Sequence, residues 1–253
     1  MIGAITQYID VAQIVLYLFW VFFAGLIYYL HQENKREGYP LESDRSPHIK
    51  VQGFPPIPEP KTYRLRDGTT RTAPNANSGS VADLKATPAA GFPGAPLNPT
   101  GNPMLDGVGP GAYAIRPDIP DMTFDGKPKM VPLSMAADCH LDKRDPNPIG
   151  MSVVGGDGVV AGTVIDAWVD RAESVLRYLE VEVAKNQRRV LVPIPFTRIT
   201  NKVAVRSIFA AHFADVPGTR DAKLITMMEE ERVMAYFGAG TLYASPARAE
   251  PLL

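Results

Sequence analysis

The sequence predicts a single transmembrane α-helix joined to a mainly-β cytoplasmic domain. In that domain, a long Pro/Gly-rich extended region leads to a small antiparallel β-barrel with a C-terminal helix. Three observations predict this fold: an uncharged apolar run near the N-terminus, 19 of the 24 prolines between Pro40 and Pro148, and short β-rich segments after Gly150. The expected divisions of the chain are an N-terminus of residues 1–10, a transmembrane helix of 11–31, an extended region of 32–149 and a barrel domain of 150–253.

The apolar run is VAQIVLYLFWVFFAGLIYYL, residues 11–30, and it contains no charged side chain. As an α-helix it is about 30 Å long, which matches the hydrocarbon core of a bilayer. A cleaved secretory signal would need basic residues before the run and small residues at a cleavage site. Residues 1–10 contain no Lys or Arg, and the run ends in two tyrosines and a leucine. A retained transmembrane helix is therefore expected.

The charges that flank the helix predict its orientation. Asp10 is the only charge before the helix, whereas Lys35 and Arg36 follow it. The positive-inside rule then places the N-terminus in the periplasm and residues 32–253 in the cytoplasm. Tyr28 and Tyr29 suit the headgroup region, and Lys35 and Arg36 are expected to contact lipid phosphates there.

The proline-rich middle excludes continuous helices, because each proline lacks an N–H donor and disfavours helical backbone at the preceding residue. Residues 62–73, TYRLRDGTTRTA, alternate around Asp67-Gly68, which predicts a β-hairpin. Apolar side chains along the region are expected to anchor an extended chain on a partner protein, and a flexible tether is the alternative. These side chains are Phe54, Tyr63, Phe92, Leu97, Met104, Leu105, Tyr113 and Ile115.

Short strands and turns dominate the segment after residue 150. The β-rich runs are 159–170, 175–183, 189–193 and 202–206. Strands of this length with turns every 8 to 12 residues predict a small antiparallel barrel. Period-two alternation places Glu180 and Glu182 on a solvated strand face. Residues 224–237, LITMMEEERVMAYF, predict a helix that ends at Gly238.

Composition and motifs argue against catalysis and nucleic-acid binding. Lys plus Arg total 26 and Asp plus Glu total 27, so the formal charge of -1 provides no basic field for nucleic acid. The single cysteine, Cys139, forms neither an internal disulfide nor, without a Cys/His cluster, a structural zinc site. GGDG at 155–158 is not followed by Gly-Lys-Ser/Thr, and neither GxSxG nor HExxH occurs. No enzymatic site and no metal site are therefore expected.

A series of short motifs follows in one order along the chain. They are REGYPL at 36–41, PTGNPM at 99–104, DGVGP at 106–110, NPIG at 147–150, AGTV at 161–164, WVD at 168–170, YLEVE at 178–182, YFGAG at 236–240 and LYA at 242–244. With these motifs, nearly the whole chain resembles the H subunit of the purple-bacterial photosynthetic reaction centre.

The resemblance implies a PRC-barrel domain on the cytoplasmic side of the L and M subunits, in a bacterial inner (intracytoplasmic) membrane. H subunits bind no pigment themselves; the complex implies bacteriochlorophyll, bacteriopheophytin, quinones, a non-haem iron and a carotenoid on partner subunits. Membrane lipids, a cytochrome subunit and a light-harvesting ring are further partners in such complexes. The implied role is a non-catalytic subunit that stabilises the L/M core on its quinone side and helps deliver protons to the secondary quinone. The alternative is a membrane-tethered PRC-barrel adaptor for another cytoplasmic protein.

The resemblance also points to individual residues. A doubly reduced quinone takes up two protons in a site closed to water, which requires acids with shifted and coupled pKa values. Glu173 matches a family carboxylate at the inner end of the proton path, close in sequence to Asp170 of the WVD motif. Arg177 is expected to hold this group of acids together electrostatically. Asp125 matches an acid near the surface entry of the path.

At the entry the chain departs from the family pattern. Some members carry a closely spaced histidine pair after the aspartate-glycine, whereas this chain has Lys127 and Lys129. A lysine with a pKa near ~10.4 stays charged at pH 7 and relays protons poorly. The entry point is therefore open, and His140 or a different acid is a substitute.

Overall fold

The computed structural model describes residues 10–43, 46–75, 84–91 and 95–249 of the 253-residue chain. Nearly all of the expected N-terminal segment 1–10, and Phe92, lie outside the described residues. The chain divides into two compact units, one of residues 1–83 with 88–96 and one of residues 84–87 with 97–253.

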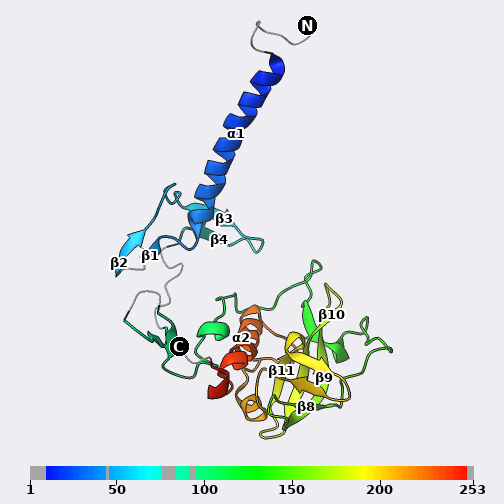
Figure 1. Cartoon of the computed structure of the whole chain (residues 1–253). Coiled ribbons are helices and arrows are strands. Elements are labelled where there is room, and N and C mark those ends of the chain that lie inside the picture. Colours follow the sequence, from blue (N-terminus) through cyan, green and yellow to red (C-terminus); the bar gives the residue numbers. More distant parts are fainter. Residues whose placement is uncertain (1–9, 44–45, 76–83, 92–94, 250–253) are drawn as a thin grey trace. The chain divides into compact units, whose positions relative to one another are not determined.

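The first unit begins with α1, Val11–Glu33 (Figure 1). The Asp10 carboxylate caps its N-terminus by accepting a hydrogen bond of 2.7 Å from the Gln13 N–H. Within the described part of the chain none of the α1 side chains is buried, and an 18-residue window within Val11–Arg36 has a mean hydropathy of 2.1. The helix is therefore long and apolar enough to cross a membrane, and it lacks the burial of a core helix.

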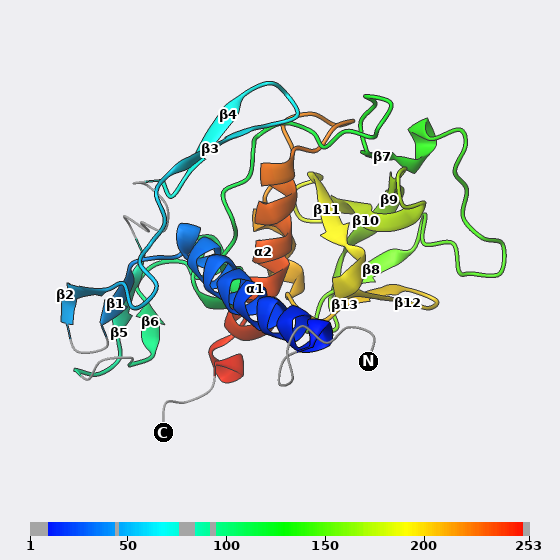
Figure 2. The ribbon, with the colours of Figure 1, turned by 90° about the horizontal axis from the view of Figure 1, so that it is seen from above.

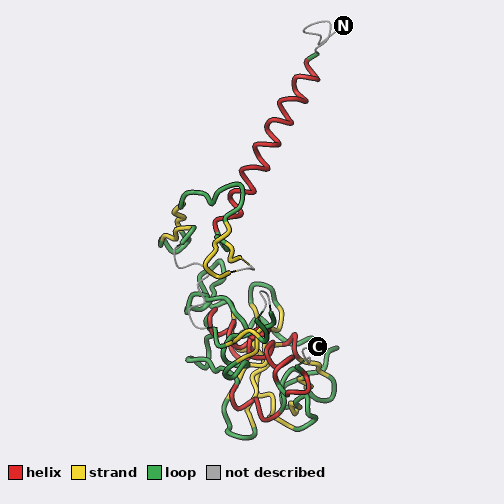
Figure 3. Tube along the Cα trace, turned by 60° about the vertical axis from the view of Figure 1, so that its left-hand side comes forward, coloured by secondary structure: helices red, strands yellow, loops and turns green. Residues whose placement is uncertain are grey.

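Short two-stranded ribbons follow α1. The strands are β1, Leu41–Ser43, β2, Ser46–Val51, β3, Lys61–Arg64, β4, Thr70–Ala73, β5, Ala86–Pro88, and β6, Leu97–Pro99. β3 and β4 pair antiparallel with Tyr63 opposite Arg71, which confirms the predicted hairpin. In its turn, the Asp67 carboxylate accepts a hydrogen bond of 2.9 Å from the Thr69 N–H, and Gly68 adopts a φ of 83°. The remaining proline-rich chain is mostly loop (Figure 3).

Most of the apolar side chains expected to act as anchors are exposed. Phe54 is 79% and Ile115 90% exposed, and Leu97 and Leu105 are also exposed, whereas Met104 is buried in the core. Large apolar side chains repeated along an extended segment are typical of a surface that another protein covers.

The second unit is built on a seven-stranded sheet in the order β11-β10-β9-β8-β13-β12, with β7 pairing β9. The strands are β7, Met130–Pro132, β8, Ser152–Val154, β9, Val160–Asp170, β10, Val175–Val183, β11, Arg189–Pro193, β12, Thr197–Ile199, and β13, Val203–Val205. All pairs are antiparallel except β8 with β13, which is parallel. The sheet curls into a half-barrel (Figure 2). This confirms the predicted small antiparallel barrel, to which the structure adds one parallel pair, β8 with β13.

The sheet of the half-barrel includes a strand, β7, that precedes residue 150. Met130 and Val131 of β7 are buried and pair with Asp170 and Val169 of β9. Residues 97–149 belong to the same compact unit as the sheet, so the division between the units lies earlier than the expected boundary at 149/150. The amino-acid composition changes at residue 150, but β7, which precedes that residue, pairs with β9 and so belongs to the unit of the sheet.

The expectation that Glu180 lies on a solvated face of β10 is wrong. Its side chain is 7% exposed, and its carboxylate accepts a hydrogen bond of 3.1 Å from Trp168 Nε1. Arg189 lies 3.6 Å away. Glu182 is exposed as expected. The Trp168 indole N–H and the Arg189 guanidinium therefore stabilise the Glu180 carboxylate inside the fold.

The C-terminal helix α2, Met227–Tyr243, lies beside β11 (Figure 2). Thr226 and Glu229 form a reciprocal capping box at its start, with hydrogen bonds of 3.1 and 2.9 Å. The predicted end at Gly238 is wrong, because the helix continues through that residue. A Cβ at Gly238 would lie 2.7 Å from the Pro110 carbonyl oxygen, and one at Gly240 would lie 2.6 Å from the Ser207 carbonyl oxygen. These glycines allow backbone to approach the helix instead of ending it.

The Gly240→Ala substitution tests this close approach. Helix propensity alone would stabilise the helix by about 1 kcal/mol, but the methyl group must displace backbone, and such overpacking costs about 1–3 kcal/mol. A lower thermal unfolding midpoint is therefore expected for the full chain in detergent, followed by circular dichroism. Gly91→Ala is the control, since a Cβ there meets nothing within 4 Å. A stabilised Gly240→Ala variant would contradict the packing.

Candidate functional site

Asp170, at the end of β9, is a buried carboxylate with four partners. Its side chain is 1% exposed and accepts backbone hydrogen bonds from Ala172 at 3.0 Å and Glu173 at 3.1 Å. Lys129 Nζ and Arg177 Nη2 each lie 3.4 Å from its Oδ2. A buried charge is costly unless it is paired and hydrogen-bonded, and Asp170 has both kinds of partner.

The same cations extend the network outward. Arg177 donates a hydrogen bond of 2.6 Å to Glu173, whose side chain is 54% exposed. Lys129 Nζ lies 3.8 Å from Glu173 and 3.7 Å from Asp121. These five residues are here named the Asp170 cluster. The predicted association of Asp170, Glu173 and Arg177 is thus present in the structure.

Strand register and a tight turn assemble the Asp170 cluster. Asp170 pairs with Met130, so Lys129 enters directly beside it from the end of β7. The turn between β9 and β10 contains Ser174 at a φ of 54° and returns the chain so that Arg177 faces Asp170. The segment that contains Asp121 and Lys129 therefore meets the β9–β10 hairpin at one end of the half-barrel.

Charge coupling within the cluster is visible in the pKa of Lys129. Partial burial acts to lower this pKa, but the charge of Asp170, its hydrogen bond, and the charges of Asp121 and Glu173 outweigh burial and raise it. Lys129 is thus a fixed positive charge at neutral pH, and it holds three carboxylates together.

A cavity of about 420 Å³ opens beside the cluster, and its walls include Lys129, Asp170 and Arg177. Glu230 of α2 and Tyr178 of β10 also line it, and the Tyr178 hydroxyl donates a hydrogen bond of 3.1 Å to Glu230. Burial raises the pKa of both groups. Sequence analysis missed this pair, Asp121 and the central place of Lys129. Glu230 could have been found as an acidic residue in the predicted helix of 224–237, which is expected to pack beside the barrel.

Asp125 and Lys127 lie away from the cluster. Both are exposed in a turn in which the Thr123 N–H donates to the Lys127 carbonyl at 2.8 Å and the Gly126 N–H donates to the Thr123 carbonyl at 3.0 Å. Of the two lysines that replace the family's histidines, only Lys129 joins the cluster. Asp125 is an exposed acid, and its role near the proton entry stays a prediction.

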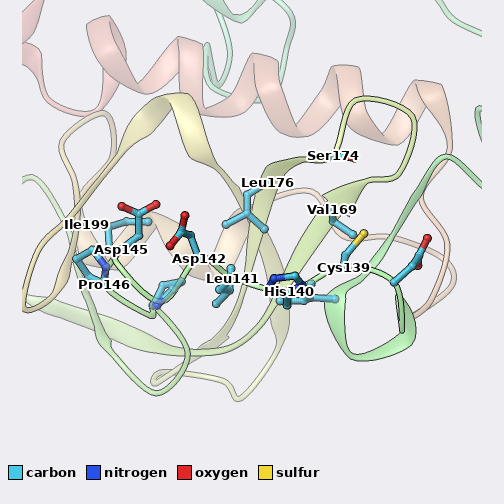
Figure 4. Close-up of a pocket in the computed structure, with 13 residues that line it drawn as sticks. Cys139, His140, Leu141, Asp142, Asp145, Pro146, Val169, Ser174, Leu176 and Ile199 are labelled. Carbon is cyan, nitrogen blue, oxygen red and sulfur yellow. The ribbon is translucent and has the colours of Figure 1, made fainter.

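His140 and Cys139 line a different cavity of about 530 Å³ (Figure 4). Val169 and Leu176, which are register partners, form part of its wall. Since side chains alternate along a strand, these two residues face away from Asp170 and Arg177. His140 is thus separated from the Asp170 cluster by the β9–β10 hairpin, and its role as a substitute at the proton entry point stays a prediction.

Lys35, for which lipid contact is predicted, is bound by backbone within its own chain. This side chain is buried, and its Nζ donates hydrogen bonds to the carbonyl oxygens of Gln52 at 2.8 Å and Pro55 at 2.6 Å. It therefore ties the proline-rich loop to the end of α1. Tyr28 and Tyr29 remain exposed on the helix, as a headgroup position requires.

Arg36 is likewise occupied within the chain. It forms two hydrogen bonds of 2.8 Å with the Glu33 carboxylate and donates to the carbonyl oxygens of Glu59 at 2.6 Å and Ala73 at 3.1 Å. Lys61 adds contacts of 3.0 Å to Glu33. Arg36 therefore stabilises the end of α1 through Glu33 and two backbone carbonyls, and its contact with lipid phosphate stays a prediction.

The chain combines one apolar helix, long enough to serve as a single-pass membrane anchor, with a curled barrel sheet that carries the Asp170 cluster at one end. Residues 142–209 match the family model of the PRC-barrel domain. Residues 3–135 match the model of the photosynthetic reaction centre, H-chain N-terminal region. The chain therefore belongs to the H-chain family of photosynthetic reaction centres, which confirms the resemblance. Its members are non-catalytic subunits, and membership implies association with the L and M subunits.

The Asp170 cluster joins the two matched regions. Asp121 and Lys129 lie in the H-chain region, whereas Asp170, Glu173 and Arg177 lie in the PRC-barrel region. Glu230 lies beyond both matches. Among the described residues, no group of three or more His, Cys, Asp or Glu side chains is arranged to hold a metal ion.

The Asp170→Asn substitution tests the electrostatic role of Asp170. Asn keeps the shape and still accepts backbone hydrogen bonds, but it leaves Lys129 and Arg177 without their buried counter-charge. A loss of about 1–3 kcal/mol in unfolding free energy is expected at pH 7, because both cations are partly exposed to solvent. Urea unfolding of the full chain in detergent measures it, with Asp125→Asn as the matched exposed control.

The pH dependence has a defined sign. The pKa of Lys129 is raised above its ordinary value of 10.5 in the folded chain. Its charge therefore contributes stability fully below pH 10.5, and this contribution is lost as pH rises through the folded pKa. The Asp170→Asn variant is expected to lose less stability in this alkaline range than the original chain. Equal alkaline losses in the two proteins would refute the coupling.

Proposed function

We propose that this chain covers the L/M core of a reaction centre on its cytoplasmic quinone side and stabilises it. In the same proposal, the Asp170 cluster helps deliver protons to the secondary quinone. The quinone, held by partner subunits, supplies the electron-accepting chemistry. This chain supplies carboxylates and fixed positive charges near the route of the protons.

The arrangement of Asp170 and Glu173 carries the proton-delivery proposal. Glu173 is half exposed and can exchange protons with water, whereas Asp170 is buried behind it, and Arg177 contacts both. Lys129 and Arg177 lower the cost of holding negative charge in this place. Protons that arrive at Glu173 thus meet a network of interacting groups that leads inward.

Glu230 extends this network along the cavity wall. Its pKa is raised by burial, which brings the carboxyl closer to the neutral pH range in which a proton relay operates. The Tyr178 hydroxyl, at 3.1 Å, fixes its orientation. We place Glu230 as a second proton-holding group beside the Asp170 cluster.

Two features support the structural role. None of the α1 side chains is buried, and large apolar side chains of the extended region, including Phe54 and Ile115, are exposed. A partner with its own transmembrane helices and a cytoplasmic face would cover both. Lys35 and Arg36 at the end of α1 favour a periplasmic N-terminus and a cytoplasmic barrel.

The Glu173→Gln substitution tests proton delivery in the assembled complex. The amide keeps the hydrogen bond to Arg177 but carries no exchangeable acid proton. Transfer of the second electron to the secondary quinone, which is coupled to proton uptake, is expected to slow about tenfold or more. Flash-induced absorption kinetics measure this rate.

Glu182→Gln is the matched control, because Glu182 is an exposed carboxylate of the same domain outside the cluster. Its kinetics are expected to be unchanged. Unaltered second-electron kinetics in the Glu173→Gln complex would remove Glu173 from the mechanism.

Assembly is tested by mild solubilisation of membranes from phototrophically grown cells, followed by pull-down of this chain. Near-infrared bacteriochlorophyll bands that bleach reversibly in light are expected in the recovered material. A colourless preparation would argue against an L/M partner and favour a tethered adaptor.

A further inference from the structure

A third cavity, of about 450 Å³, lies at the β12–β13 end of the half-barrel. Its polar lining consists of three arginines and three hydroxyl residues: Arg198, Arg206, Arg248, Thr197, Ser207 and Thr241. No Asp or Glu lines it. The other two cavities described above each carry at least three carboxylates, so this cavity differs from them in the sign of its charge.

The three arginines form no salt bridge with a carboxylate of the described chain. Other arginines of the same unit do: Arg220 lies 2.7 Å from Asp118, and Arg177 lies 2.6 Å from Glu173. Three guanidinium groups that converge without a counter-charge repel one another, and an anion between them would relieve that repulsion.

Strand register brings two of these arginines to one face. Arg198 of β12 pairs with Ala204 of β13, and Arg206 follows two residues after Ala204. Residues two apart in an extended segment point the same way. Arg198, Ala204 and Arg206 therefore line the same wall of the cavity.

Arg248 is held in place by the backbone. Its Nη1 donates hydrogen bonds to the carbonyl oxygens of Ser207 at 2.6 Å and Gly240 at 2.8 Å, and its Nη2 donates to the Arg206 carbonyl at 2.8 Å. Its guanidinium lies 4.7 Å from the centre of the Phe209 ring. A fixed cation loses little conformational entropy when it binds an anion.

Ser207 provides a second, independent observation. Its side chain is 6% exposed, and its Oγ is buried without a hydrogen-bond partner in the described chain. Leaving a buried hydroxyl unpaired costs about 1–3 kcal/mol. Ser207 lines the cavity, and rotation of its side chain would present this unpaired hydroxyl to a ligand oxygen there.

We infer that this cavity binds a phosphate group. The guanidinium groups of Arg198 and Arg206 can match phosphate oxygens with paired hydrogen bonds, and Arg248 adds a fixed positive charge. Phe196 and Pro195 add an apolar wall that suits the remainder of a phosphate ester. The phosphate belongs either to the headgroup of an anionic phospholipid or to a small soluble phosphate. The inference is independent of the proposed role in proton delivery.

The test uses the full chain in detergent and ³¹P NMR line widths. One sample receives inorganic phosphate, and a second receives short-chain phosphatidylglycerol diluted in short-chain phosphatidylcholine. Protein-dependent broadening of at least one anionic signal is expected. Each of Arg198→Gln and Arg206→Gln is expected to weaken binding about tenfold, the effect of losing one charge-assisted hydrogen bond.

Arg232→Gln is the matched control, since Arg232 is an exposed arginine of α2 outside the cavity. It is expected to bind as the original chain does, and circular dichroism checks that all variants keep their fold. Broadening of phosphatidylglycerol alone assigns the site to a lipid headgroup, of inorganic phosphate alone to a soluble phosphate, and of both to the phosphate group itself. Absence of broadening, or equal broadening in the Arg198→Gln and Arg206→Gln variants, overturns the inference.

Discussion

The neutralisation of buried Asp170 is the constraint on which the functional end of the half-barrel depends. A carboxylate that is 1% exposed requires both cations and hydrogen-bond donors nearby. Lys129 comes from the end of β7, Arg177 from β10, and the backbone donors from the turn between β9 and β10. Meeting this requirement holds the segment before residue 150 against the sheet. The same requirement places the half-exposed Glu173 beside a buried acid, so one electrostatic constraint serves both folding and the proposed proton delivery.

A related device recurs elsewhere in the chain. Proline-rich loops are short of N–H donors, so many of their carbonyl oxygens find no partner in regular strand pairing. Lys35 and Arg36 supply donors to the carbonyls of Pro55, Glu59 and Ala73. Arg248 does the same for carbonyls at the end of α2 and after β13. Long cationic side chains thus replace missing ladder hydrogen bonds, which explains how a region with so many prolines holds defined positions.

Alternation along strands separates the cavities of the second unit chemically. Val169 and Leu176 face the cavity that contains His140, whereas Asp170 and Arg177 face the cavity that contains Glu230. The third cavity, at β12–β13, is lined by arginines without carboxylates. Alternation along β9 and β10 therefore separates the first two cavities, and the arginine-lined cavity lies on other strands, β12 and β13.

Local sequence patterns determined the spanning helix, the 62–73 hairpin, the strands β9, β10, β11 and β13 and the existence of α2, because apolar runs, turn residues and periodicity act over a few neighbouring residues. They did not indicate the short strands β7, β8 and β12. The motif order also determined the family and brought Glu173, Asp170 and Arg177 together as a site. Only the tertiary structure decided that Lys35 and Arg36 are buried, that Glu180 is paired with Trp168, and that Glu230 joins the cavity beside the Asp170 cluster. It also decided that α2 runs through Gly238, since that glycine faces the Pro110 carbonyl. These outcomes depend on partners distant in the chain, and no local pattern specifies which backbone or charge a side chain will meet.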